Sequence, residues 1–163
     1  MIRVKDHEKS LKFYQEVMGM LLVRTSENKD ASFNLYFLGY SGGKGAATSA
    51  SGTESTADRE GLLELTWNYG TEKDAEFKYH NGNDQPQGFG HICKLTRVEV
   101  SVQADVPKGV SVDDLDAACK RFEDLGVNWK KRLTDGRMRN VAFVLDPDNY
   151  WVEVVQNQSL ARL

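Results

Sequence analysis

Three side chains in this sequence are of the types that hold a divalent metal ion, and each lies in a short apolar run. His91 follows the glycine-rich turn 88–90, whereas Glu64 and Glu153 lie near the centres of the runs 62–68 and 150–155. A carboxylate in such a run is costly unless something pairs with it. We therefore interpret His91, Glu64 and Glu153 as ligands of one divalent metal. Their nitrogen and oxygen donors suit Zn²⁺ or Ni²⁺.

Each of these residues also has a simpler interpretation when it is taken alone. A single histidine on an apolar strand is more often a satisfied core residue. A glutamate within a strand more often faces water from the solvated side of a sheet. The metal interpretation depends on finding all three together in elements that a repeat relates.

The elements that must position these side chains recur within the chain. Asp6 is predicted to cap a helix over about 7–18, which Gly19 ends, and Asp113 or Asp114 is predicted to cap a second helix. A polar turn is predicted over 26–30. The predicted strands are 1–4, 20–24, 33–40, 62–67, the run around His91, 127–129, 141–145 and 150–155.

This order is strand, helix and three strands, used twice, and it predicts an α+β fold of two βαβββ modules. The first module is predicted over 1–87, with a truncated first strand and a flexible loop over about 41–61 that is rich in Gly, Ser, Ala and Thr. The second is predicted over 88–163, with an insert at about 94–110.

Composition excludes several classes of protein. The 163 residues carry 21 Lys and Arg against 24 Asp and Glu, a formal charge of −3 that argues against nucleic-acid binding. No apolar run is long enough to span a membrane. Cys93 and Cys119 are too few for a disulfide scaffold, and we expect both to be buried thiols of a cytoplasmic protein.

Several motifs occur in an order and spacing that point to one family. They are the runs 1–6, 9–11, 13–14, 18–20, 35–38, 63–66 with Asn68, 79–83, 88–92 and 146–153. In these runs the chain resembles glyoxalase I (lactoylglutathione lyase) of the vicinal-oxygen-chelate superfamily. The detailed sequence is most similar to the second half of the fused fungal forms.

The resemblance implies isomerisation of the hemithioacetal of methylglyoxal and glutathione to S-lactoylglutathione, which detoxifies methylglyoxal. It implies Zn²⁺ or Ni²⁺ as cofactor, glutathione as cosubstrate, and Glu64, His91 and Glu153 as metal ligands. Glu153 is also the implied catalytic base, because a carboxylate that leaves the metal can take and return a proton. The implied glutathione contacts are Arg3, Asn68, Lys131, Gly136 and Trp151.

A fourth metal ligand, a Gln, would lie two positions before Met1, so we expect this chain to lack it. Together with the insert, that leads us to expect impaired turnover. The alternative is a non-catalytic module of the same fold that binds thiols or a partner. The resemblance also implies a site between two repeats, either within a fused chain or across a homodimer.

Overall fold

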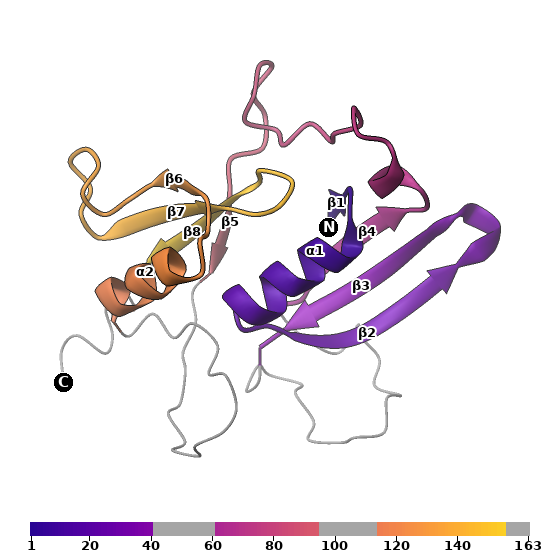
Figure 1. Ribbon diagram of the computed structural model, residues 1–163, viewed down its shortest axis with the longest axis horizontal. Helices are drawn as coiled ribbons and strands as arrows, with labels where there is room; N and C mark the ends of the chain where they lie inside the picture. The colour runs from indigo at the N-terminus through magenta and orange to yellow at the C-terminus, as the bar shows by residue number, and fades with distance from the viewer. Residues whose placement is uncertain (41–60, 95–113, 156–163) are drawn as a thin grey trace, which may run out of the picture. The chain divides into compact units, whose positions relative to one another are not determined.

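The computed structural model describes residues 1–40, 61–94 and 114–155 (Figure 1). The chain forms two compact units, Met1–Tyr79 and His80–Leu163. The predicted division into modules after Gln87 stays a prediction. The predicted flexible loop and the predicted insert lie outside the described residues, apart from Gly61 and Lys94.

The first unit is a mixed sheet with a helix against it. Its strands are in the order β1-β4-β3-β2, with β1 parallel to β4 and the other neighbours antiparallel. The elements are β1 (Ile2–Val4), α1 (His7–Lys12), a π-helical turn (Phe13–Val17), β2 (Leu21–Asn28), β3 (Phe33–Gly39) and β4 (Leu63–Asn68).

The second unit repeats this plan, with strands in the order β5-β8-β7-β6 and β5 parallel to β8. The elements are β5 (Ile92–Lys94), α2 (Leu115–Asp124), β6 (Trp129–Lys131), β7 (Val141–Leu145) and β8 (Trp151–Val155). The predicted α+β class, with two βαβββ modules, is therefore confirmed.

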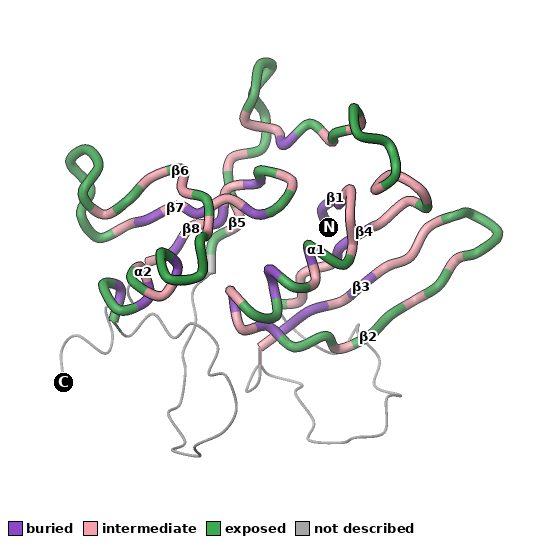
Figure 2. Tube along the Cα trace, in the orientation of Figure 1, coloured by how far each residue is buried: buried purple, intermediate pink, exposed green. Residues whose placement is uncertain are grey.

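Each sheet has one face against its helix, because side chains alternate between the two faces of a strand. His7 of α1 stacks on Tyr36 and Trp67, with ring centroids 5.4 and 4.0 Å apart, so α1 covers the face that holds them. In the second unit the Phe122 ring of α2 packs against the Trp129 ring of β6, with ring centroids 6.0 Å apart. We call the opposite face of each sheet its helix-distal face. Buried segments of α1, β3, β7 and β8 are purple in Figure 2.

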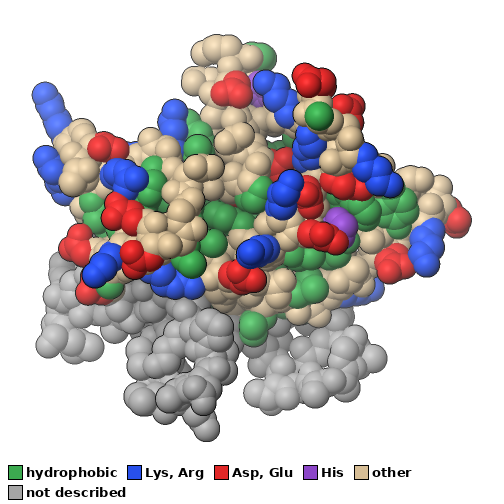
Figure 3. All heavy atoms as spheres, viewed as in Figure 1, with side chains coloured by type: hydrophobic (Ala, Val, Ile, Leu, Met, Phe, Trp, Pro, Cys, Tyr) green, Lys and Arg blue, Asp and Glu red, His purple; other side chains and the backbone are tan. Residues whose placement is uncertain are grey.

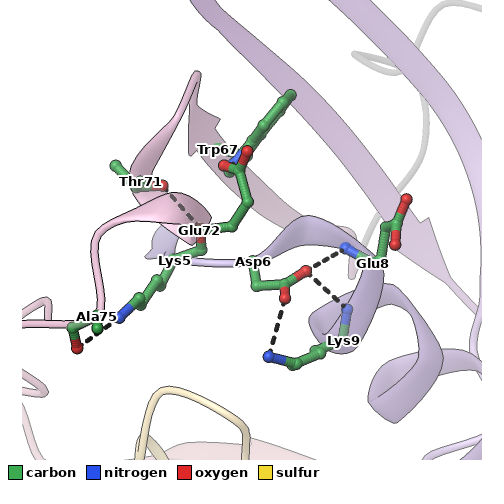
Figure 4. Close-up of polar contacts among 8 residues, drawn as sticks. All are labelled: Lys5, Asp6, Glu8, Lys9, Trp67, Thr71, Glu72 and Ala75. Atoms are coloured by element: carbon green, nitrogen blue, oxygen red, sulfur yellow. Dashed lines mark hydrogen bonds and ion pairs between the residues drawn. The ribbon is translucent and has the colours of Figure 1, made fainter. Parts of the chain in front are cut away.

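Asp6 fixes the start of α1, as predicted. Its Oδ1 accepts hydrogen bonds from the backbone N–H groups of Glu8 (3.1 Å) and Lys9 (3.2 Å), and its Oδ2 pairs with the Lys9 ammonium at 3.1 Å (Figure 4). Burial acts to raise the pKa of Asp6, but these contacts together hold it below its ordinary value. The Thr71 hydroxyl donates to the Lys5 carbonyl at 2.7 Å, and this bond holds the backbone just before Asp6.

The structure corrects three local predictions. The α-helix ends at Lys12, and a π-helical turn follows in which Phe13 and Tyr14 are buried. Strand β2 continues through the predicted turn 26–30 as far as Asn28, because β3 pairs with it along its whole length. Strand β6 lies at Trp129–Lys131 and not at 127–129.

Side chains of both charges are interspersed over the surface shown in Figure 3, as expected for a formal charge of −3. In the parts of the chain that the structure describes, no helix has the length and apolarity needed to cross a membrane.

Replacing Asp6 with Ala is expected to lower the free energy of unfolding by about 1 kcal/mol, because two helix N–H groups lose their acceptor. Urea denaturation at neutral pH measures this change. The control is Asp30→Ala, which removes an exposed carboxylate outside α1.

The contribution of Asp6 should also depend on pH. A folded-state pKa below the unfolded value stabilises the fold above the unfolded pKa, and this contribution disappears as pH falls through the folded pKa. The difference between wild type and Asp6→Asn should therefore shrink in acid; a constant difference would contradict the assignment.

Candidate metal and substrate site

The second unit brings two of the three predicted ligands together. Parallel pairing of β5 with β8 sets Cys93 beside Glu153. His91 immediately precedes β5, which corrects the expectation that it lies within the strand. The His91 Nε2 and Glu153 Oε2 atoms are 2.7 Å apart, with 40% of the His91 side chain and 17% of the Glu153 side chain exposed.

This pair lies on the helix-distal face of the second sheet. Val152 and Val154, on either side of Glu153 in β8, are buried on the face that α2 covers. Glu153 itself is paired with Phe143 of β7. The Phe143 ring also meets the His91 ring edge-on, with centroids 5.4 Å apart. The alternation of β8 therefore turns the carboxylate away from the core and towards the imidazole.

Cys93 is an exposed free thiol and Cys119 is half-buried, which corrects the expectation that both are buried. Partial desolvation of the sulfur raises the pKa of Cys93 to about 11, together with a hydrogen bond to Glu153 and the negative charge of that carboxylate. The thiol is therefore neutral at physiological pH and can donate to Glu153. Sequence reasoning missed this contact, because it depends on the β5–β8 register.

Glu64 lies on the helix-distal face of the first sheet together with two of the predicted substrate contacts. Glu64, Thr66 and Asn68 alternate along β4, and Arg3 of β1 pairs with Thr66. The Arg3 guanidinium reaches past Thr66 and donates from Nη1 to Asn68 Oδ1 at 3.4 Å. The Asn68 Nδ2 in turn donates to the Tyr79 hydroxyl at 2.8 Å. The register of β1 and β4 thus gathers Arg3, Asn68 and Glu64 on one face.

Thr66 is a residue of this face that sequence reasoning missed. It is 5% exposed, and its hydroxyl has no hydrogen-bond partner among the described residues. A buried hydroxyl without a partner costs about 1–3 kcal/mol, so the Thr66 hydroxyl is a candidate to bind a water molecule, an ion or substrate. The sequence could have indicated Thr66 through its position midway between Glu64 and Asn68, since alternate residues of a strand share one face.

The other three predicted substrate contacts belong to the second unit. Trp151 lies two residues before Glu153 on the same face, half-buried, with the Lys130 ammonium 4.6 Å from its ring centroid. The Lys131 ammonium donates to the carbonyls of Met138 (2.6 Å), Val141 (2.8 Å) and Arg132 (3.2 Å). Gly136 adopts a left-handed φ of 68° in the turn between β6 and β7.

The second unit brings an imidazole nitrogen and a carboxylate oxygen to 2.7 Å from each other, and both are donor types that would hold a divalent ion. Within either unit, the described residues contain no group of three His, Cys, Asp or Glu side chains that could hold a metal. Each unit therefore presents only part of a metal-ligand set: His91 and Glu153 in the second unit, and Glu64 in the first.

Comparison with known proteins decides the family. Residues 1–100 and 108–154 match the model of the Glyoxalase/Bleomycin resistance protein/Dioxygenase superfamily. The chain belongs to this superfamily. The match also supports the paired βαβββ architecture described above.

Relatives within the superfamily confirm the resemblance to glyoxalase I. The chain is 48% identical over 160 residues to a lactoylglutathione lyase of Pseudomonas putida, covering 96% of this chain and 82% of that protein. It is 45% identical over 164 residues to the glyoxalase I of Saccharomyces cerevisiae, covering 99% of this chain and 43% of that protein. The chain therefore spans less than half the length of the yeast relative.

Solved structures from the superfamily share the fold. A glyoxalase I structure from Leishmania major, described as trypanothione-dependent, superposes with a TM-score of 0.62 at 25% identity and covers 99% of this chain and 87% of that one. Glyoxalase I from Zea mays superposes with a TM-score of 0.59 at 25% identity, covering 96% of this chain and 43% of that one.

Both thiols are expected to react slowly at neutral pH. Desolvation, joined by nearby carboxylates, raises the pKa of Cys93 and of Cys119 to about 11. Since the thiolate is the nucleophile, alkylation rates should keep rising with pH up to about 11. Iodoacetamide labelling of metal-free protein followed by peptide mass spectrometry measures each rate. Cys93→Ser and Cys119→Ser serve as reciprocal controls, and rapid labelling of either thiol at pH 7 would contradict the stated pKa.

Proposed function

We propose that this chain is a lactoylglutathione lyase, which isomerises the hemithioacetal of methylglyoxal and glutathione to S-lactoylglutathione. The observation that carries the proposal is the His91–Glu153 pair, 2.7 Å apart on the helix-distal face of the second sheet. It occurs in a chain that is 48% identical to a relative of that name. The activity removes methylglyoxal.

His91, Glu153 and Glu64 would hold the divalent ion that such chemistry requires, and their nitrogen and oxygen donors suit Zn²⁺ or Ni²⁺. When bound, the ion supplies a Lewis acid that stabilises the negative charge developing on a substrate oxygen. Beyond the backbone pairing of β4, the Glu64 carboxylate has no hydrogen bond or ion pair with any described residue, so it is available as a ligand.

Glu153 is the proposed base. The reaction moves a proton between adjacent carbons, and a carboxylate beside both carbons can remove it from one and return it to the other. The His91 imidazole and the Cys93 thiol both interact with the carboxylate, while 17% exposure limits its contact with water. A positioned base of this kind contributes a rate factor of about 10²–10⁴.

The glutathione portion is proposed to bind along the same two faces. Arg3 is the exposed central residue of β1, where its guanidinium can clamp a carboxylate. Asn68 offers an amide beside it. Lys131 contributes positive charge near the Gly136 turn, because the carbonyls of Arg132, Met138 and Val141 that flank this turn hold its ammonium there. Trp151 offers a ring face for apolar atoms of the substrate.

We place the activity in the cytoplasm, because Cys93 and Cys119 are free thiols that suit a reducing compartment. We further propose that the ligand set is completed across a two-fold homodimer, in which Glu64 of one chain joins His91 and Glu153 of the other. The chain covers 82% of the Pseudomonas putida relative, against 43% of the yeast relative. The expected impairment of turnover stays a prediction that the rate itself measures.

Glu153→Gln is expected to reduce turnover by at least about 10²-fold, because an amide cannot take up the proton. The assay follows thioester absorbance with methylglyoxal plus glutathione after metal-stripped protein is loaded with Zn²⁺ or Ni²⁺. Glu76→Gln changes an exposed carboxylate outside the site and should leave the rate unchanged. Metal binding by the wild type without turnover would overturn the proposal and favour the non-catalytic module.

Mixing Glu64→Gln protein with Glu153→Gln protein tests the dimer. If one intact site forms in each mixed dimer, an equimolar mixture should recover about a quarter of wild-type activity, because half of the dimers are mixed and each holds one good site of two. The two variants should be almost inactive when assayed separately. Mixing without recovery, after subunit exchange has been verified with differently tagged chains, would contradict a shared site.

A further inference from the structure

The segment Asn81–Gly90, here called the His91 lead-in loop, is closed by its own backbone and by one contact to the residue before β8. The Gly82 carbonyl accepts hydrogen bonds from the N–H groups of Gly88 (2.8 Å) and Phe89 (3.0 Å). Phe89 packs edge-on against the buried Tyr150, which precedes β8, with ring centroids 5.7 Å apart. These contacts hold the two ends of the loop together without any help from Asn83.

Gly82 is tightly enclosed in this arrangement. It has a φ of 79°, and a Cβ atom at this position would lie 2.2 Å from the Cβ of Phe89. The loop backbone therefore has little room to rearrange. The side chain of Asn81 adds two more bonds, since its Oδ1 accepts from the N–H groups of Asn83 (2.8 Å) and Asp84 (3.0 Å).

The side chain of Asn83 has a separate task within this closed loop. Its Oδ1 accepts a hydrogen bond from the Gly90 N–H at 3.2 Å, and its Nδ2 donates to the Gly90 carbonyl at 2.5 Å. One amide thus binds both backbone polar groups of one residue, as a neighbouring strand would in an antiparallel pair. Gly90 has a φ of 94°, a conformation that side-chain-bearing residues rarely adopt.

This clamp acts on the peptide group that leads directly into His91. The Gly90 carbonyl carbon is bonded to the His91 nitrogen, so holding that carbonyl sets the plane from which the imidazole projects. Burial does not orient the ring, because 40% of the His91 side chain is exposed. The His91 Nε2 atom nevertheless lies 2.7 Å from Glu153 Oε2, and the His91 ring centroid lies 5.4 Å from that of Phe143.

We propose that Asn83 is a positioning residue for His91: its amide fixes Gly90 so that the imidazole is presented to Glu153 and to the metal. The inference rests on the proposed function, because it takes His91 as a metal ligand. It adds a residue that contacts neither substrate nor metal and acts only through the backbone of Gly90. The sequence indicates 79–83 only as one of the family motifs and assigns Asn83 no role.

Two variants separate this role from simple loop closure. Asn83→Ala removes both bonds to Gly90 and leaves the Gly82 bonds and the Phe89–Tyr150 contact in place. Asn83→Asp keeps an acceptor for the Gly90 N–H but sets an oxygen against the Gly90 carbonyl. The matched control is Asp84→Ala, which removes an exposed side chain from the same turn and leaves its backbone bond to Asn81.

The first measurement is Zn²⁺ affinity of metal-stripped protein, by competition with a chromophoric chelator. Asn83→Ala and Asn83→Asp should each weaken binding about 10–100-fold, the loss typical when the groups that orient a metal-ligating histidine are removed. Asp84→Ala should bind as wild type does. Turnover of the Asn83 variants should be restored by raising the Zn²⁺ concentration, since the clamp orients a ligand and takes no part in proton transfer.

The second measurement needs no metal. In the wild type, ring protons of His91 and Phe143 should give a nuclear Overhauser effect, which should weaken or vanish in Asn83→Ala while urea denaturation still shows a cooperative fold. Should Asn83→Ala fail to fold, Asn83→Asp supplies the same comparisons. An unchanged Overhauser effect and unchanged affinity in a folded variant would overturn the positioning role. A wild type that binds Zn²⁺ without turnover would overturn the proposed function alone.

Discussion

The parallel pairing of the first and last strands of each unit is the constraint on which the candidate site depends. Strands β1 and β4, and likewise β5 and β8, are far apart in sequence and become neighbours only because the intervening chain crosses over. In each unit that crossover includes the helix, which packs on one sheet face and buries the apolar side chains there. The polar side chains of the last strand must then project from the helix-distal face.

The cost of placing carboxylates on these strands shows how the two halves of the site differ. Glu153 is largely removed from water, and the His91 imidazole and the Cys93 thiol offset the loss of its hydration. Glu64 is half-buried and has no such partner among the described residues, while the neighbouring Thr66 hydroxyl is also without one. The second unit can therefore hold its donors in place in advance, whereas the first presents groups that still require a partner.

Local structure was predictable wherever a single residue dictates the backbone. Asp6 caps α1, and Asp114 caps α2 through its bond to the Ala117 N–H. The π-helical turn after Lys12 was not predictable, because the apolar spacing of an α-helix and of one ending in a wider turn is almost the same. The length of β2 was missed for a different reason, since its polar end is ordered by pairing with β3.

Residue type, spacing and alternation are properties of the chain, so they were enough to indicate the family, the repeated βαβββ order and the candidate ligands Glu64, His91 and Glu153. Three facts became known only from the folded arrangement: Cys93 lies beside Glu153, the Thr66 hydroxyl lacks a partner among the described residues, and Asn83 binds Gly90. These facts depend on strand register and loop closure. Both are set by contacts between residues, and the distance between two residues in space does not follow from their separation in the sequence.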